Sequence, residues 1–350
     1  MLSVMQIFKI ILGIVLSAFV LIIAIRFTSS YMEIGESSKE MEVVMGLKKT
    51  IEDVYTTGIP TDFDLKDLEE TITFYSPPNI GTSVTPVSLD PVPTFLVPGE
   101  RVSVHRGEYD LGWWKFHFVY VLPETKILFV PLGRSEIVWK TAENITKYFP
   151  STENTKTKVL FGVGCNETEE KQTYLFLNWE RDYFADVVLP YLFENGYEFV
   201  PCTRIEGYKI ITITETPTDA DFQVVPITSE TGRVYINDTL EGPQEYLYKT
   251  PLDVISLLLG GRKFYEYESK RFLEELYMVC DLASREANLL RMKANNPECD
   301  ILYSKFVQVL GSLKDIIENG DFTNEDDVRE FDKKLKKSVE VYEEMEEMGC

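Results

Sequence analysis

The residues that could carry chemistry are few, and the densest group of them lies at 159–170. An apolar run ends there in Gly162 and Gly164, followed by Cys165 and an Asn-Glu-Thr sequon. Gly-x-Gly after a strand can open a phosphate loop, and a cysteine can be a nucleophile or half of a disulfide. Glu167 replaces the third glycine of a dinucleotide loop, and further acids follow that would repel a pyrophosphate. We therefore expect a buried strand and a turn here, and no cofactor.

Two histidines offer the next possible site. His105 and His117 lie on the two arms of a predicted hairpin, where Glu108 or Asp110 could add an oxygen ligand, so a surface metal site is conceivable. The simpler interpretation is two histidines on polar strand faces, with no metal. No Gly-x-Ser-x-Gly motif supports a Ser-His-Asp triad.

A group of acids and a row of aromatic residues could each bind a ligand, but each also has a purely structural explanation. The acids at 62, 64, 67, 69 and 70 could gather calcium, but without the EF-hand glycine a solvated helix start is the expectation. The aromatic row at 114, 116, 118 and 120 lies on one face of a strand, which favours core over a carbohydrate or partner platform.

The cysteines can be paired by helix geometry. Cys280 lies roughly 22 Å along its helix from the turn that precedes Cys299, so those two cannot pair. Cys299 begins the next predicted helix and Cys350 ends the last one, which predicts a disulfide between them. Cys165 and Cys202 each follow a strand and could meet if those strands are parallel neighbours. Cys280 is then expected to be free and buried.

The first 28 residues predict a transmembrane signal anchor. Residues 10–25 are apolar and uncharged, and with the preceding residues they reach the length needed to cross a bilayer. A cleaved signal peptide is the alternative. The cysteines and the sequons at Asn144, Asn166 and Asn237 favour an extracytoplasmic location for the bulk of the chain, where glycosylation and disulfides occur.

Apolar spacing and turn residues divide the rest of the chain into four segments. Residues 29–58 predict an amphipathic stalk helix, 59–125 a Pro-rich connector and β-hairpin, 126–250 a mixed α/β domain and 251–350 a helical bundle. The expected fold class is therefore α/β, a mixed sheet with flanking helices, placed after a transmembrane helix and closed by an antiparallel C-terminal bundle.

A hydrophobic helix that continues into an amphipathic one resembles the N terminus of type IV pilins and pseudopilins. This resemblance covers about 55 residues and implies an envelope-assembly subunit, although no Glu lies just inside the apolar run.

Charge and motifs together favour binding over catalysis. A net charge of −22 makes nucleic acid an improbable partner, because phosphate binding needs a basic face. We expect a single-pass membrane protein that acts as a binding, adhesion or envelope-assembly module, with the membrane and envelope proteins as partners. The alternatives are a pilin-like subunit and a membrane-tethered hydrolase using acids at strand ends, Glu180, Asp182 and Glu206.

Overall fold

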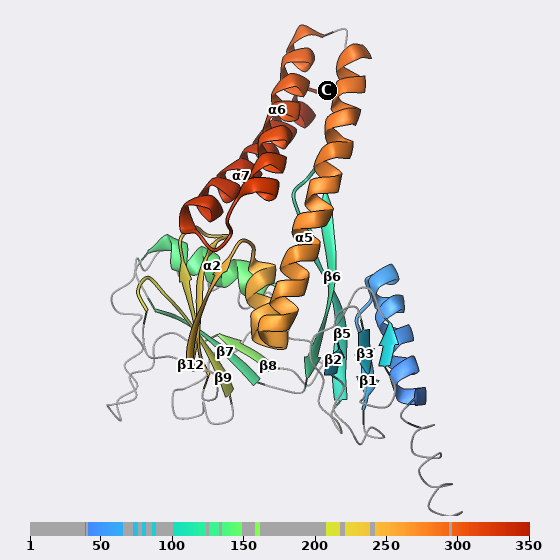
Figure 1. The fold of residues 1–350 in the computed structure, drawn as a ribbon, viewed down its shortest axis with the longest axis vertical. Coiled ribbons are helices and arrows are strands. Elements are labelled where there is room, and N and C mark those ends of the chain that lie inside the picture. The colour runs from blue at the N-terminus through green and yellow to red at the C-terminus, as the bar shows by residue number, and fades with distance from the viewer. Residues whose placement is uncertain are drawn as a thin grey trace, which may run out of the picture.

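A layered body of strands and helices carries a long helical projection (Figure 1). The computed structural model describes residues 39, 41–65, 73–75, 79–81, 86–88, 101–123, 126–132, 135–148, 158–161, 208–217, 221–238, 242–293 and 296–350. Among these residues no helix combines the length and the apolarity needed to span a bilayer. The predicted anchor at 1–28 lies outside them.

The largest sheet is mixed, as predicted. Its order is β12-β11-β10-β9-β7-β8, in which β7, β8, β9 and β10 run parallel and β11 and β12 are antiparallel additions. The bounds are β7 (Lys126–Leu132), β8 (Lys158–Phe161), β9 (Tyr208–Thr214), β10 (Phe222–Pro226), β11 (Gly232–Asp238) and β12 (Gly242–Tyr248).

Helix α2 (Glu136–Thr146) flanks this sheet. Its buried stripe is Val138, Trp139, Ala142 and Ile145, spaced as one face of a helix requires. The predicted mixed sheet with a flanking helix is therefore confirmed.

A second sheet centres on the predicted hairpin. Strand β5 (Arg101–Asp110) pairs with β6 (Lys115–Pro123), and β1 (Thr61–Asp64) adds to the free edge of β5. Strand β6 is buried on both faces. Its aromatic row joins the main core through Phe116, Phe118 and Tyr120, while Val119 and Val121 join a second core. The row is core, as expected, with Trp114 at its half-buried end.

The second core is completed by a helix over residues 41–57. Val44, Leu47, Ile51 and Val54 are fully buried against β5 and β6, which agrees with the amphipathic pattern predicted for the stalk. The helix runs toward the hairpin tip, because Arg106 in mid-β5 donates to the Tyr55 carbonyl at 2.9 Å. Its first residues therefore point away from the helical projection.

A small antiparallel sheet lies in the Pro-rich connector. It consists of β2 (Thr73–Tyr75), β3 (Asn79–Gly81) and β4 (Pro86–Ser88), in that order. Pro86 is the first residue of an edge strand, where a missing N–H does not break a ladder. The Pro-rich connector therefore contains short strands, of which β2 and β4 lie at the edges and β3 in the middle.

Three helices form the projection. They are α5 (Pro251–Lys293), α6 (Pro297–Asn319) and α7 (Glu325–Glu347). Gly261 has φ of 67°, a left-handed conformation that glycine adopts readily and that breaks α5. Asn296 and Asn324 cap α6 and α7 by accepting a backbone N–H two residues later. The predicted C-terminal helices are therefore confirmed.

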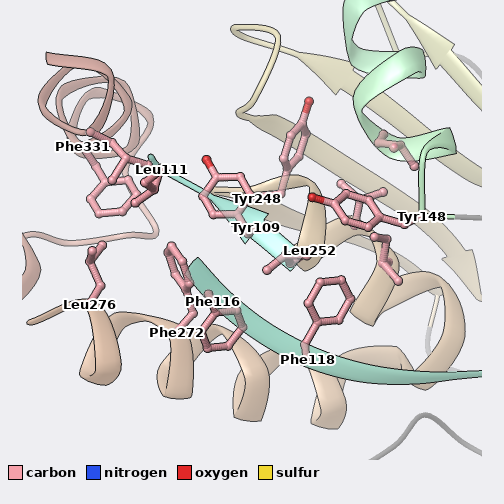
Figure 2. Packing of buried hydrophobic residues seen from close by; sticks show 14 of the residues in the cluster. Tyr109, Leu111, Phe116, Phe118, Tyr148, Tyr248, Leu252, Phe272, Leu276 and Phe331 are labelled. Atoms are coloured by element: carbon pink, nitrogen blue, oxygen red, sulfur yellow. The ribbon is translucent and has the colours of Figure 1, made fainter. Parts of the chain in front are cut away.

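The tip of the hairpin packs against all three helices. Trp113 lies edge-on to Phe306 of α6, with ring centroids 5.8 Å apart, and donates from Nε1 to Ser338 of α7 at 3.1 Å. Trp114 stacks on Phe272 of α5 at 5.9 Å. One continuous core thus joins the hairpin, the large sheet and the projection (Figure 2). The predicted domain boundaries stay a prediction.

The predicted C-terminal disulfide is confirmed. Cys299 and Cys350 are bonded with Cα atoms 5.5 Å apart, which ties the start of α6 to the end of the chain. Cys280 is free and buried as expected, and burial raises the pKa of its thiol to about 12. The proposed Cys165–Cys202 pair lies outside the described residues.

Two expectations on secondary structure were wrong. Residues 61–64 form a strand and not a helix start, because Asp62 pairs with Arg101 at 2.9 Å across the sheet and Phe63 contacts Gly46 of the preceding helix. Strand β12 was not predicted, since its Gly-Pro start reads as a turn. The other acids of the calcium hypothesis, at 67, 69 and 70, lie outside the described residues.

Gly107 allows the closest approach within the hairpin. Its cross-strand partner is Phe118, and a Cβ at position 107 would lie 2.1 Å from the Phe118 ring. Gly107→Ala should therefore lower the free energy of unfolding by about 1 to 3 kcal/mol in urea titrations, because the buried ring must move.

Gly311→Ala is the matched control. Gly311 is exposed in mid-α6 with open space around its Cα, so alanine should raise stability by about 0.5 to 1 kcal/mol through helix propensity. Equal stability of both variants would contradict the close packing of Phe118 on Gly107.

Candidate functional site

A cavity of about 660 Å³ lies where β5, α2, the β10–β11 turn and α7 meet. We call it the Glu230 cavity. Its lining mixes acids, bases and aromatic groups: Arg106, Gly107, Glu108, Tyr109, Asp110, Leu111, Tyr120, Lys147, Tyr148, Glu230, Asp332, Leu335, Lys336, Val339 and Glu340. Concave sites that gather polar groups from several elements are the usual location of ligand binding.

The β10–β11 turn presents Glu230 to the cavity. The turn is closed by two bonds to the Thr231 carbonyl, from the N–H groups of Ile227 and Thr228 at 2.8 and 2.9 Å. The Thr228 hydroxyl accepts from the Glu230 N–H at 3.2 Å. These local bonds fix the backbone that carries the carboxyl group.

Asn144 of α2 clamps this turn. Its amide nitrogen donates to the Ser229 carbonyl at 3.0 Å and to Glu230 Oε1 at 2.6 Å. The other carboxyl oxygen of Glu230, Oε2, is buried and has no hydrogen-bond partner in the structure. An unmatched buried acceptor of this kind is costly unless a proton or a ligand donor reaches it.

Burial raises the pKa of Glu230, and the nearby charge of Asp332 acts in the same direction. Lys147 and Lys336 oppose the shift without cancelling it. The carboxyl group therefore holds its proton to a higher pH than an exposed glutamate does, which suits either a hydrogen-bond donor or a general acid.

Asp332 is the second buried carboxylate of the cavity. It is held on α7 by Lys336, one turn later, at 2.7 Å. Tyr109 and Tyr148 line the same wall, and burial followed by the charge of Glu230 raises the pKa of Tyr109 well above its usual value. Figure 2 shows these tyrosines with Tyr248 pointing into the region between the sheet and α7.

The metal site considered for the two histidines is not assembled, and the expectation that both lie on polar strand faces is wrong for His105, which is buried. His105 pairs with Tyr120 and His117 with Glu108, so the two histidines lie three positions apart in register and on opposite faces of the hairpin. His105 is buried and stacks on Tyr120 at 5.5 Å, and burial lowers its pKa to about 4. The turn was expected near Asp110 and Leu111, but it lies further along the chain, between Asp110 and Lys115, which shifts the register by three residues. No trio of metal-ligating side chains occurs in the part of the chain that the structure describes.

The sequons differ in accessibility. The Asn144 amide makes the two bonds above, so a glycan there would require them to break, whereas Asn237 is exposed on β11. Asn166 and the strand-end acids Glu180, Asp182 and Glu206 lie outside the described residues. Glycosylation stays a prediction.

Sequence reasoning missed Glu230 and Asp332. Each is one acid among many, and only folding brings a turn at 227–231 next to α7. The one available signal was the Thr-Ser-Glu-Thr turn between two strands, which predicts where a side chain is held but not what it faces.

Replacing Glu230 tests its unusual pKa. The proton on Glu230 stabilises the fold fully below the unfolded pKa, and this stabilisation is lost as the pH rises through the raised folded pKa. Glu230→Gln keeps an uncharged group, so the variant should gain roughly 1 kcal/mol over the wild type at about pH 8 and little at about pH 4.

Urea unfolding at both pH values measures this difference. Glu340→Gln is the control, because Glu340 lines the same cavity but is exposed, and it should change stability by less than about 0.5 kcal/mol. A Glu230→Gln variant that loses stability relative to the wild type as the pH rises would refute the burial argument.

Searches of protein-family models, of curated proteins and of solved structures found no match to this chain. Its function is therefore argued from its own residues.

Proposed function

We propose that this chain is a single-pass membrane-anchored protein whose extracytoplasmic part is a binding, adhesion or envelope-assembly module, and that the Glu230 cavity is its ligand site. The observation that carries the ligand site is the buried Glu230 Oε2, an acceptor without a partner in a concave pocket. The group that fits it donates hydrogen bonds, such as an ammonium or a sugar hydroxyl.

Two features support the location. The apolar residues 10–25 have the length and composition of a membrane span. The Cys299–Cys350 disulfide is of a kind that persists in oxidising compartments and is rare in the cytosol. The helix over 41–57 begins at the end of the molecule far from the projection, so an anchor there would direct the projection away from the membrane (Figure 1).

Membrane fractionation tests the anchor. The full chain should pellet with membranes and resist alkaline carbonate, whereas a chain lacking residues 1–28 should be released. Intact-mass measurement with and without reduction should show the Cys299–Cys350 bond. A full-length chain found soluble, with five free thiols, would contradict the proposal.

A membrane-tethered hydrolase is the second candidate function. It is favoured by one observation, the raised pKa of Glu230 beside a second buried carboxylate, Asp332, in the same cavity. Such a pair can divide general acid and general base roles. The described lining contains no Ser, Cys or His, so it offers no Ser-His or Cys-His pair.

The Glu230→Gln variant distinguishes a ligand-binding function from a hydrolase function. As a binding site, the cavity should give a rise in melting temperature with glucosamine or glucose that Glu230→Gln reduces, and no turnover of nitrophenyl glycosides, esters or phosphates. Turnover by the wild type that falls at least about 100-fold in Glu230→Gln would instead establish the hydrolase. Glu318→Gln, at an exposed glutamate outside the cavity lining, should behave as wild type in both assays.

A further inference from the structure

The distal half of α5 carries a second apolar face, opposite the face that packs on α6. Its four apolar side chains leave between 60% and 83% of their surface exposed. The buried face runs through Leu276, Cys280 and Ala287. A helix with apolar stripes on two opposite sides is adapted to contacts on both. The exposed seam consists of Met278, Leu282, Arg285, Leu289 and Met292.

The spacing of the seam is that of a coiled coil. Its five positions are separated by four, three, four and three residues, the alternation of heptad d and a positions. Cys280 and Ala287 then fall at f positions, directly away from the seam, which agrees with their burial against the projection. The repeat covers two heptads, enough for a specific but weak contact.

The seam continues into an apolar groove. A hollow of about 700 Å³ lies between α5 and the α6–α7 turn, and Met278 borders both features. Leu273, Ile317 and Phe322 supply apolar lining to the groove. The available contact surface therefore extends beyond the helix itself.

We propose that a second copy of this chain docks on the seam with its α5 helix antiparallel. In a parallel pair in register, Arg285 would face its own copy, and like charges in the seam repel. In the antiparallel register that places Met278 opposite Leu289 of the second copy, Arg285 instead lies opposite Leu282.

The charges at the two ends of the seam agree with this orientation. Glu275 and Arg291 are already paired within the chain, with Arg271 and Asp300. Glu274 near the start of the seam is only loosely paired, with Lys270 at 3.6 Å, and Lys293 lies at the seam's end. Antiparallel pairing sets Lys293 of each helix level with Glu274 of the other, which brings opposite charges together. The contact is isologous, so it closes as a two-fold dimer and does not propagate into filaments.

In an antiparallel dimer the two bodies lie at opposite ends of the paired helices. For membrane-anchored chains this geometry joins copies on two facing membranes, which is an adhesion function. That consequence rests on the anchor proposed above, whereas the pairing itself does not.

Sedimentation of the full chain in a density-matched mild detergent tests the pairing. Because the contact is small, the wild type should pass from monomer to dimer between about 1 and 100 µM. Leu289→Glu should weaken association at least about tenfold, because it buries a charge in the seam opposite the apolar Met278 of the second copy. Leu290→Glu is the matched control, since Leu290 is also exposed on α5 but lies off the seam, and it should dimerise as the wild type does.

Spin labels at Lys293→Cys test the orientation. Antiparallel pairing separates the two labelled positions by roughly 28 Å along the helix axis, whereas parallel pairing would bring them within about 10 Å. A monomer at every concentration, equal effects of both leucine variants, or the short distance would each overturn the proposal. A chain that remains soluble without detergent would refute the anchor but leave both measurements valid.

Discussion

The burial of β6 on both faces is the constraint on which the rest of the structure depends. Phe116, Phe118 and Tyr120 point into the core shared with the sheet and the projection, while Val119 and Val121 point into the core closed by the helix over 41–57. A strand with two apolar faces must be covered on both, so elements distant in sequence pack against it. Arg271 of α5 also contacts β6, because its guanidinium donates a hydrogen bond to the His117 carbonyl at 3.1 Å.

The Glu230 cavity follows from the same arrangement. Strand β5, held by β6, supplies one wall, and α7, held by Trp113 through Ser338, supplies another. The turn that carries Glu230 is then kept between them by Asn144. The buried Glu230 oxygen without a partner is an unfavourable feature that borders the cavity. Such exceptions concentrate at functional sites, which is why we propose ligand binding there.

The features that follow from regular apolar spacing along the sequence could be predicted. The C-terminal helices, the aromatic row of β6 and the Cys299–Cys350 bond follow from apolar spacing and helix rise, which depend on local geometry. Strand β1 could not, because its four residues include two acids that suggest a helix start, and β12 could not, because it begins with Gly-Pro. The predicted register of the two histidines was wrong because the hairpin turn lies between Asp110 and Lys115, later in the chain than expected. Glu230 and Asp332 were missed because only tertiary packing brings them to one cavity.

Native-state hydrogen exchange measures the central claim that β6 joins both cores. The β6 amides at 116–122 should be among the slowest in the chain and exchange only with global unfolding, because neither face can open alone. The free end of the projection, near 290–300, should exchange earlier through local opening. The account would be contradicted if the β6 amides exchanged faster than those of the projection, since the hairpin would then be a peripheral element.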